Sequence, residues 1–493
     1  MSNKKIKKVL LITPPYHSGV VECAGRWLPL GFVYIAGALR DAGFEPVIYD
    51  AMSEFHNHEE IRKRILDEKP DVVATTAFTA AVNDSLKILS DAKDIDERIV
   101  TVIGGIHPTF LYRDILSRCP FVDFAVRGEG EITFVELLDC LNSGKNLQKV
   151  KSIAYWSDGG TVVTPARAFI ENLDNLSPAW DLINWKIYNY RVKENSTLAI
   201  VSSSRGCTQG CLFCSQQVFW KKTWRARSAK NFVDELVSLR ERFSVNVAMI
   251  CDEFPTSDRI RWELILDQLI ERRPGIDLLM ETRVDDIVRD ESIMGKYRDA
   301  GISHIYVGVE SVDQKTLNEF NKNIKVEESK KAIDIINRHG MISETSFVLG
   351  MPGDTLESIK NTLELAKHYN PDMAFFLAIA PWPYSEIYTT LKPYIFTYDY
   401  SKYNLIEPVI TPENMTVDEL KECLLKTTEE FFKWKFQNLG KLSPEKQEFM
   451  KKVMKILIKY SYLGEIMRER FRDTRDIPDA MTSMDPGIIE LFT

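Results

Sequence analysis

The chain has 493 residues, of which 44% are hydrophobic and 27% are charged. This composition is ordinary for a globular protein and argues against general disorder. The 63 Lys and Arg residues against 71 Asp and Glu residues give a net charge of −8, which argues against nucleic acid as a partner.

The first 15 residues combine a basic start with a short apolar run, as a signal peptide would. The run is too short for that role, and Thr13-Pro14-Pro15 ends it without a cleavage motif, so a first β-strand is the better interpretation. Nowhere does an apolar stretch reach the roughly 18 residues that a membrane helix needs. We therefore expect a cytoplasmic protein with no membrane partner.

Strand and helix patterns alternate through residues 1–145. Such alternation is typical of a parallel sheet covered by helices on both faces, so this part of the α/β chain is predicted to be a doubly wound, Rossmann-like domain. The expected strands are 7–12, 46–50, 71–76, 99–104 and 121–127, and the expected helices are 29–42, 59–68, 82–92 and 131–141.

Residues 146–195 break the rhythm and are predicted to form a linker, with a β-hairpin around Asp158-Gly159-Gly160. Alternation resumes over residues 196–400 and predicts an incomplete (β/α)6 barrel. Its expected strands are 198–204, 247–251, 278–283, 304–310, 345–350 and 373–380. Residues 401–493 are rich in Lys and Glu and are predicted to form a C-terminal helical region.

Three of the eight cysteines, Cys207, Cys211 and Cys214, lie within eight positions in the spacing C-x3-C-x2-C, directly after an expected strand. Three thiolates on a tight loop can bind three irons of a 4Fe–4S cluster and leave the fourth iron open. Structural zinc usually takes four Cys or His ligands, and no histidine lies between Asn189 and Asp258. A redox C-x2-C pair would leave Cys207 unexplained.

This segment resembles the radical S-adenosylmethionine (SAM) superfamily, and the resemblance extends over about residues 197–385. It is carried further by four segments at the ends of expected barrel strands. These are CDEFPTSD (251–258), LLMETRVDDI (278–287), HIYVGVESVDQKTLNEFNK (304–322) and SFVLGMPGDT (346–355). Barrel active sites are built at those strand ends.

The resemblance implies a role for each matching residue. Cys207, Cys211 and Cys214 would ligate the cluster, whose open iron would bind SAM. Arg283 would pair with the carboxylate of SAM and Glu310 with its ribose hydroxyls. Phe213 and the backbone of Leu349 and Gly350 would contact the adenine. Arg283 could instead form an ion pair with Asp285 or Asp286, and Glu310 could form a strand-end ion pair.

The N-terminal domain resembles the cobalamin-binding domain that precedes the barrel in many radical SAM enzymes. PLGFVYIAGALRDAGFEPVIYDA, IGGIHPT and VRGEGE carry this resemblance. Ligands of doubly wound sheets bind at strand carboxyl ends. The cofactor contacts that it implies are Thr76, Phe78, Thr79, Gly104, Gly105, His107, Gly128, Glu129 and Gly130.

One departure from the cobalamin mutase pattern D-x-H-x-x-G concerns the axial ligand, because Ala51-Met52 follows Asp50 and no histidine stands at the expected position. We therefore predict cobalamin bound without a histidine ligand, with Phe78 or Thr79 below the cobalt. His107 could be only a turn residue. A Rossmann-like module without cobalamin is the alternative; a nicotinamide site is disfavoured because G-x-G-x-x-G is absent after the first strand.

CSQQVFW after the cysteines and APWPYSEIY (380–388) resemble a subgroup that includes anaerobic magnesium-protoporphyrin monomethyl ester cyclases and archaeal and bacterial methyltransferases. The resemblance implies methyl transfer from methylcobalamin to an unactivated sp3 carbon, with an electron donor such as ferredoxin or flavodoxin. Tyr384 or Tyr388 would transfer a proton.

The substrate is harder to infer. A protein residue, such as a glutamine of methyl-coenzyme M reductase, is our first hypothesis. The alternative is oxidative cyclisation of a porphyrin, or another small-molecule transformation. A cobalamin sensor or carrier without catalysis would leave the three cysteines unexplained.

Overall fold

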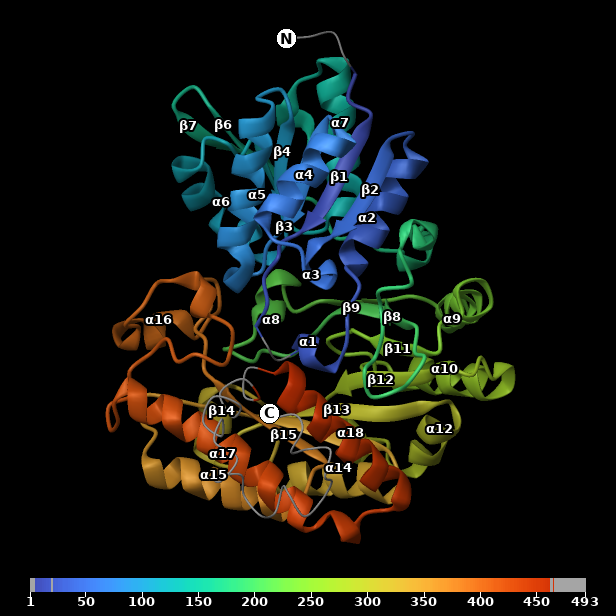
Figure 1. The fold of residues 1–493 in the computed structure, drawn as a ribbon, viewed down its shortest axis with the longest axis vertical. Coiled ribbons are helices and arrows are strands. Elements are labelled where there is room, and N and C mark those ends of the chain that lie inside the picture. The colour runs from blue at the N-terminus through green and yellow to red at the C-terminus, as the bar shows by residue number, and fades with distance from the viewer. Residues whose placement is uncertain (1–4, 19–20, 462–463, 465–493) are drawn as a thin grey trace. The chain divides into compact units, whose positions relative to one another are not determined.

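The computed structural model describes residues 5–18, 21–461 and 464. The chain forms two compact units, coloured by residue number in Figure 1. The first comprises Met1–His17, Leu28–Ile187 and Asp399–Ser401, and the second comprises Ser18–Trp27, Tyr188–Tyr398 and Lys402–Thr493. The domain limits expected at residues 145, 195 and 400 differ from these divisions and stay predictions. The helical region expected over residues 401–493 is described up to residue 461 and at residue 464, and the rest lies outside the described residues.

The first unit is built on a seven-stranded sheet with the order β2-β1-β3-β4-β5-β6-β7. Its first five strands are parallel, as alternation predicted, and the hairpin expected around Gly159 adds two antiparallel strands at the edge. The strands are β1 (Lys8–Thr13), β2 (Glu45–Asp50), β3 (Val72–Thr76), β4 (Val100–Gly104), β5 (Phe124–Val126), β6 (Ile153–Ser157) and β7 (Gly160–Val163).

Helices cover both faces of this sheet, which confirms the doubly wound fold. Alternate residues of β1 explain the two layers, because Leu10 and Ile12 pack with one set of helices and Val9 and Leu11 with the other. The first set is α4 (His58–Glu68), α5 (Val82–Ile95) and α6 (Ile106–Arg118); the second is α2 (Leu30–Asp41) and α7 (Gly130–Ser143).

Helix α6 is the longest helix of the first unit that was not predicted from the sequence. Gly104, Gly105 and Pro108 suggested a turn, but Pro108 is the third residue of the helix, where its missing N–H breaks no helical hydrogen bond.

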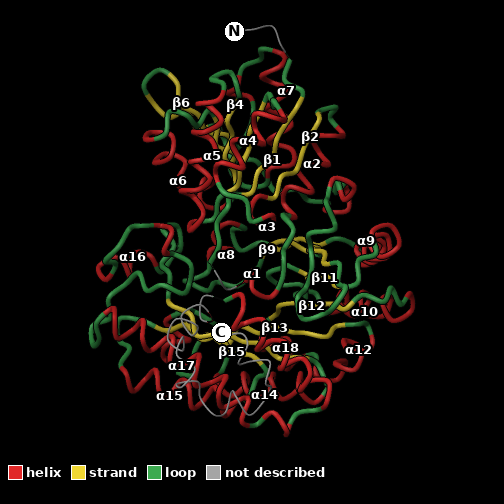
Figure 2. Tube along the Cα trace, in the orientation of Figure 1, coloured by secondary structure: helices red, strands yellow, loops and turns green. Residues whose placement is uncertain are grey.

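The second unit contains a parallel six-stranded sheet with the order β15-β14-β13-β12-β11-β8, which confirms the partial (β/α)6 barrel. Figure 2 shows its strands alternating with helices. The strands are β8 (Leu198–Val201), β11 (Val247–Ile250), β12 (Asp277–Thr282), β13 (Ile302–Glu310), β14 (Ile342–Leu349) and β15 (Met373–Ala378). The intervening helices are α9 (Ala229–Phe243), α10 (Arg259–Arg272), α12 (Met294–Asp299), α14 (Val326–Arg338) and α15 (Leu356–Tyr369).

Two long helices, α17 (Val417–Gln437) and α18 (Pro444–Tyr460), are fastened to this sheet by a buried cluster of charges at the start of β15. Asp372 is fully buried, and its Oδ2 accepts from Lys446 Nζ of α18 at 2.5 Å. Lys435 of α17 is also buried; its Nζ donates to Asn370 Oδ1 at 2.8 Å and lies 3.7 Å from Asp372 Oδ1. One carboxylate thus faces two ammonium groups.

This imbalance has a cost, because burial, together with the neighbouring Lys446, lowers the pKa of Lys435 to about 8. Between that value and 10.5 the folded chain binds fewer protons at this site than the unfolded chain, so folding becomes more favourable as pH rises through this window. Below this pH window, the charged side chain of Lys435 destabilises the folded state.

We predict that Lys435→Met raises the free energy of unfolding at pH 7 by about 1–3 kcal/mol, because it removes a partly desolvated charge. The difference from wild type should shrink between pH 8 and 10.5. Urea unfolding at several pH values measures both effects. Lys433→Met, at an exposed position of the same helix, is the matched control. A gain that does not depend on pH would contradict this explanation.

Candidate functional site

The cysteine loop of the second unit, residues 207–214, begins at a two-stranded ribbon. Strand β9 (Ser204–Gly206) pairs with β10 (Trp224–Ala226). Gly206 has a φ of +94°, and a Cβ there would lie 2.2 Å from the carbonyl oxygen of Thr223. Only glycine fits this backbone, which directs the chain into the loop.

Glu253, just after β11, fixes the start of the loop. Its Oε2 accepts from the backbone N–H of Gly206 at 3.0 Å, and its Oε1 accepts from Trp220 Nε1 at 2.7 Å. Farther along, the N–H of Leu212 donates to the carbonyl of Phe320 at 2.9 Å. The ring of Phe213 packs edge-on against Phe320, with centroids 5.0 Å apart.

The three cysteines on this loop are free thiols. Burial raises the pKa of Cys214 to about 11, while the backbone N–H groups of Gln217 and Gln216 act in the opposite direction. Burial also raises the pKa of Cys207, opposed by the N–H of Gln209 and by Arg283. N–H groups directed at sulfur favour a thiolate, and a bound metal ion would remove the proton outright.

Within residues 5–18, 21–461 and 464, no three His, Cys, Asp or Glu side chains converge on one ion position. A 4Fe–4S cube does not require this, because each thiolate binds a different iron. Three free thiols on one loop, with N–H donors beside two of them, fit such a cluster by their chemistry.

A buried ion pair lies beside the cysteine loop. Lys322 Nζ donates to Glu310 Oε1 at 2.8 Å, and both side chains are more than nine-tenths buried. Glu310 ends β13 with a φ of +64°, a strained conformation for a residue with a side chain. The pKa of Lys322 is raised by Glu310 and then by Cys211, in opposition to its burial. The lysine is therefore a fixed positive charge near the thiols.

Arg283, expected to bind a carboxylate, already holds one. Its Nε and Nη2 donate to the two carboxylate oxygens of Asp285 at 2.9 and 3.2 Å. This is one of the two ion pairs weighed from the sequence. The guanidinium still interacts with Cys207 and Cys211, so the pair lies close to the cysteine loop.

Glu281 and Tyr306 lie side by side in register on β12 and β13. Burial raises the pKa of Glu281 to about 8, reinforced by Glu253, Asp252 and Glu310, so this carboxyl carries a proton at neutral pH. The Tyr306 hydroxyl shares a hydrogen bond with Ser346. These groups form a polar wall on one face of the barrel sheet.

The remaining barrel residues of the prediction lie around the same strand ends. Gly350 follows β14 with a φ of +89°, and its N–H donates to Asp354 Oδ2 at 2.8 Å. The carbonyl of Leu349 accepts from the N–H of Ile379 at 2.9 Å, so both backbone groups already have partners. Tyr384 and Tyr388 are partly buried and flank Ile387, whose N–H donates to the carbonyl of Leu212 at 3.0 Å. Their segment thus contacts the cysteine loop.

In the first unit, the expected cofactor residues gather at the carboxyl ends of β3, β4 and β5. Thr76 ends β3, and Phe78 follows it with 45% of its surface exposed. Gly105 has a φ of +96°, and a Cβ there would lie 2.7 Å from Thr76 Oγ1 and 2.8 Å from the carbonyl of Ala77. Close contact of these two loops therefore requires a glycine.

His107 lies in the first turn of α6, as one of its buried residues. Its Nδ1 lies 3.2 Å from Thr79 Oγ1, and its ring meets Tyr400 edge-on at 5.0 Å. Burial lowers the pKa of His107 to about 4, so the imidazole is neutral. Its ring contacts both of these side chains, and its predicted contact with the cofactor stays a prediction.

The other predicted positions of this unit form the turn after β5. The N–H of Gly128 donates to Thr109 Oγ1 at 2.9 Å, and Glu129 Oε2 accepts from the N–H of Ile170 at 2.7 Å. Gly130 starts α7, and Gly104 ends β4. Exposed Phe55 (50%), which stacks on His17, joins Phe78 at this edge of the sheet and was not predicted. Aromatic side chains beside glycine turns fit a flat, largely apolar macrocycle.

Sequence reasoning also missed Lys322, Glu253 and Glu281. Each lies inside a segment that carried the superfamily resemblance, so the signal was present, but ionisable residues in a sequence do not reveal which of them pair in the interior.

None of the described helices is long and apolar enough to cross a membrane.

Comparisons with known proteins agree with this geometry. Residues 16–138 match the family model of the B12 binding domain, and residues 201–366 match that of the Radical SAM superfamily. The solved structure of OxsB, described as a cobalamin-dependent S-adenosylmethionine radical enzyme, has a TM-score of 0.72 with 16% sequence identity. That comparison covers 99% of this chain and 79% of OxsB, and shows a shared fold.

Two curated relatives are similar over most of their length. The anaerobic magnesium-protoporphyrin IX monomethyl ester cyclase of Rubrivivax gelatinosus is 37% identical over 430 residues, which cover 86% of this chain and 77% of the relative. A protein of Pyrococcus horikoshii, named an uncharacterized methyltransferase, is 30% identical over 434 residues, covering 87% and 93%. The chain therefore belongs to the family of cobalamin-binding radical S-adenosylmethionine enzymes.

Proposed function

We propose that the chain is a C-methyltransferase that delivers a methyl group to an unactivated sp3 carbon. The observation that carries the proposal is the set of three free thiols on one rigid loop, beside the buried Lys322–Glu310 pair at the carboxyl end of a barrel strand. A noncatalytic cobalamin carrier would have no use for this arrangement.

In this proposal Cys207, Cys211 and Cys214 hold three irons of a 4Fe–4S cluster, and the fourth is left for SAM. Together the cluster, SAM and cobalamin supply radical chemistry and a transferable methyl group. The chain's own residues position and shield the reactants. Glu253 and Gly206 fix the loop, and Phe213 packs an apolar ring beside it.

The buried charges have a second task in this proposal. Glu310 accepts hydrogen bonds from ribose hydroxyls, and its hydrogen bond with Lys322 holds the side chain in place. Arg283 donates from one side of its guanidinium to Asp285, and the other side would orient a SAM carboxylate. Tyr384 or Tyr388 is the proposed proton-transfer residue.

In the first unit, Thr76, Phe78, Thr79 and the turns at Gly104-Gly105 and Gly128–Gly130 are the proposed cobalamin contacts. Phe78, which has no ligating atom, and Thr79 would lie on the lower face. His107 would position Thr79, because its Nδ1 lies 3.2 Å from the Thr79 hydroxyl.

The identity of the substrate is the more specific part of the proposal. A protein residue such as glutamine is compatible with methyl transfer, and the name of the Pyrococcus relative supports a methyltransferase. The name of the Rubrivivax relative supports the alternative, oxidative cyclisation of a porphyrin. In either reaction a reduced ferredoxin or flavodoxin would supply the electron in the cytoplasm.

We predict that Cys211→Ala abolishes formation of 5′-deoxyadenosine from SAM and lowers bound iron, because one of three cluster ligands is lost. Anaerobic reconstitution, iron analysis and chromatography after reduction with dithionite measure both. Cys423→Ser, in α17, is the control and should keep wild-type iron and product. Full product from Cys211→Ala would exclude the assigned ligand set.

We predict that SAM with a labelled methyl group leaves one labelled methyl on the product, with 5′-deoxyadenosine and S-adenosylhomocysteine formed alongside it. Mass spectrometry of candidate substrates checks this. An unlabelled product that has lost hydrogens would contradict methyl transfer and support the cyclase hypothesis.

We predict that product formation falls as pH rises through about 8, since Glu281 then loses the proton that it would donate to a bound reactant. Glu281→Gln keeps a donor and should remove this alkaline decline, while Glu281→Ala should be slow at every pH. A pH–rate series on the three proteins is the measurement. An unchanged decline in Glu281→Gln would assign it to another group.

A further inference from the structure

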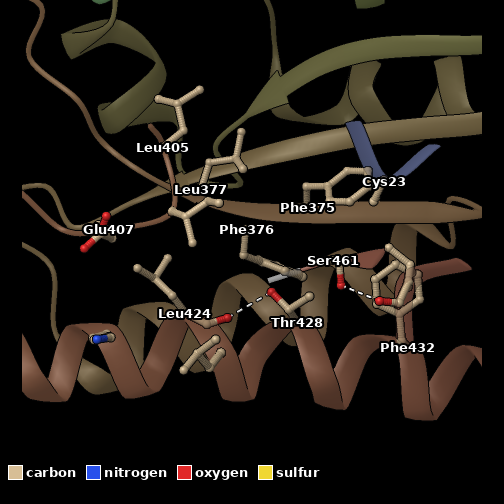
Figure 3. A pocket seen from close by; sticks show the side chains of 14 residues that line it. Cys23, Phe375, Phe376, Leu377, Leu405, Glu407, Leu424, Thr428, Phe432 and Ser461 are labelled. Carbon is tan, nitrogen blue, oxygen red and sulfur yellow. Dashed lines mark hydrogen bonds between the residues drawn. The ribbon is translucent and has the colours of Figure 1, made fainter. Parts of the chain in front are cut away.

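An apolar pocket lies inside the second unit, between β15 and the C-terminal helices. Figure 3 shows Phe375 and Leu377 of β15 above it and Leu424 and Thr428 of α17 below. The cavity has a volume of about 80 Å³ and continues into a mouth that is open to solvent.

The wall of the pocket is apolar because its hydroxyl groups are satisfied locally. Thr428 Oγ1 donates to the carbonyl of Leu424 at 2.9 Å, and Ser461 Oγ donates to that of Leu457 at 2.5 Å. Neither hydroxyl needs a partner in the pocket. A polypeptide segment here would bring N–H and C=O groups without partners, at a cost of about 1–3 kcal/mol each. A hydrocarbon has no such cost.

Two of the three β15 residues that line the pocket, Phe375 and Leu377, lie on the face of the sheet that carries the polar wall, and Phe376 lies on the other face. Glu281 is in register with Tyr306, Tyr306 with Glu344, and Ser346 with Phe375. Register partners share a face, as do residues two apart along a strand, so Glu281, Tyr306, Ser346, Phe375 and Leu377 all lie on one face. A ligand that leaves the pocket along this face would reach proton-bearing groups.

Two charged residues, Glu407 and Lys421, also line the pocket and bear on which ligands it prefers. Glu407 is held by Asn404, whose Nδ2 donates to Glu407 Oε2 at 3.1 Å. Lys421 also lines the pocket from α17, on an exposed position, and has no acidic partner within ion-pair distance in the described part of the chain. An acidic group on the ligand would complement this ammonium.

We propose that this pocket binds the hydrocarbon body of a small-molecule substrate whose acidic group pairs with Lys421. The identification of the occupant as substrate rests on the proposed function; the pocket and its chemical preference do not. The reacting carbon lies toward the polar wall, and the apolar body lies between β15, α17 and α18.

The test uses the full chain, reconstituted anaerobically, and titrates it calorimetrically with n-decanoate and with n-decanol. We expect one decanoate to bind per chain. Leu425→Trp places a large ring in the pocket and should weaken binding of both probes at least tenfold. Leu264→Trp, at an exposed site on α10, should bind as wild type does. Equal affinities for the two variants would overturn the proposal.

The charge preference has its own pair of variants. Lys421→Ala should weaken decanoate about fivefold and leave decanol unchanged, whereas Lys426→Ala, which removes an exposed lysine paired with Glu422, should change neither. Equal losses for both probes in Lys421→Ala would overturn the ion pair. Thermal unfolding of each variant, followed by circular dichroism, identifies those that fail to fold; if Leu425→Trp does, Thr428→Phe replaces it.

A polypeptide occupant is the competing outcome. Displacement of decanoate by a glutamine-containing peptide would overturn the small-molecule assignment. The same preparations are assayed for 5′-deoxyadenosine. If wild type makes none, the proposed function fails, while the decanoate titrations still decide the nature of the pocket.

Discussion

The arrangement of the three thiols depends on a backbone that is fixed at both ends of the cysteine loop. At the start, Gly206 passes so close to the carbonyl of Thr223 that any side chain would collide, and Glu253 accepts its N–H. Near the end, Leu212 is bonded through its N–H to Phe320 and through its carbonyl to Ile387. The loop is thereby tied to the ends of several strands, where the other polar groups of the unit also gather.

Those polar groups share one electrostatic problem. Glu253, Glu281 and Glu310 are carboxyls at or near the ends of neighbouring strands, and like charges so close cannot all be ionised in a poorly hydrated interior. The structure resolves this by giving Glu310 the buried Lys322 and by leaving Glu281 protonated. One carboxyl is thus held in a buried ion pair, and another carries a proton that it can donate.

Much of this fold could be read from alternation of strand and helix patterns, since both sheets depend on local periodicity and on short connections. Helix α6 was not predicted because Gly105 and Pro108 resemble a turn, although proline is tolerated in a first helical turn. The cysteines were identified by spacing alone. The partners of Arg283 and Glu310 could not be chosen from sequence, because Asp285 and Lys322 are set by side-chain directions and burial. The protonation of Glu281 depends first on its burial and then on carboxyls of other segments of the chain. The segment 399–401 had no signal linking it to the first unit.

That short segment, Asp399–Ser401, has a topological consequence. Tyr400 covers His107, and the carbonyl of Ser401 accepts a hydrogen bond from the Tyr16 hydroxyl, so the first unit is completed by residues more than 200 positions beyond its main body. The second unit in turn includes residues 18–27, from near the start of the chain. The two units are interlaced along the chain, and neither corresponds to one continuous fragment. A vitamin-binding fragment cut near residue 190 would lose the Tyr400 ring that packs against His107, and ribosomal synthesis must pass residue 401 before the first unit has all of its parts.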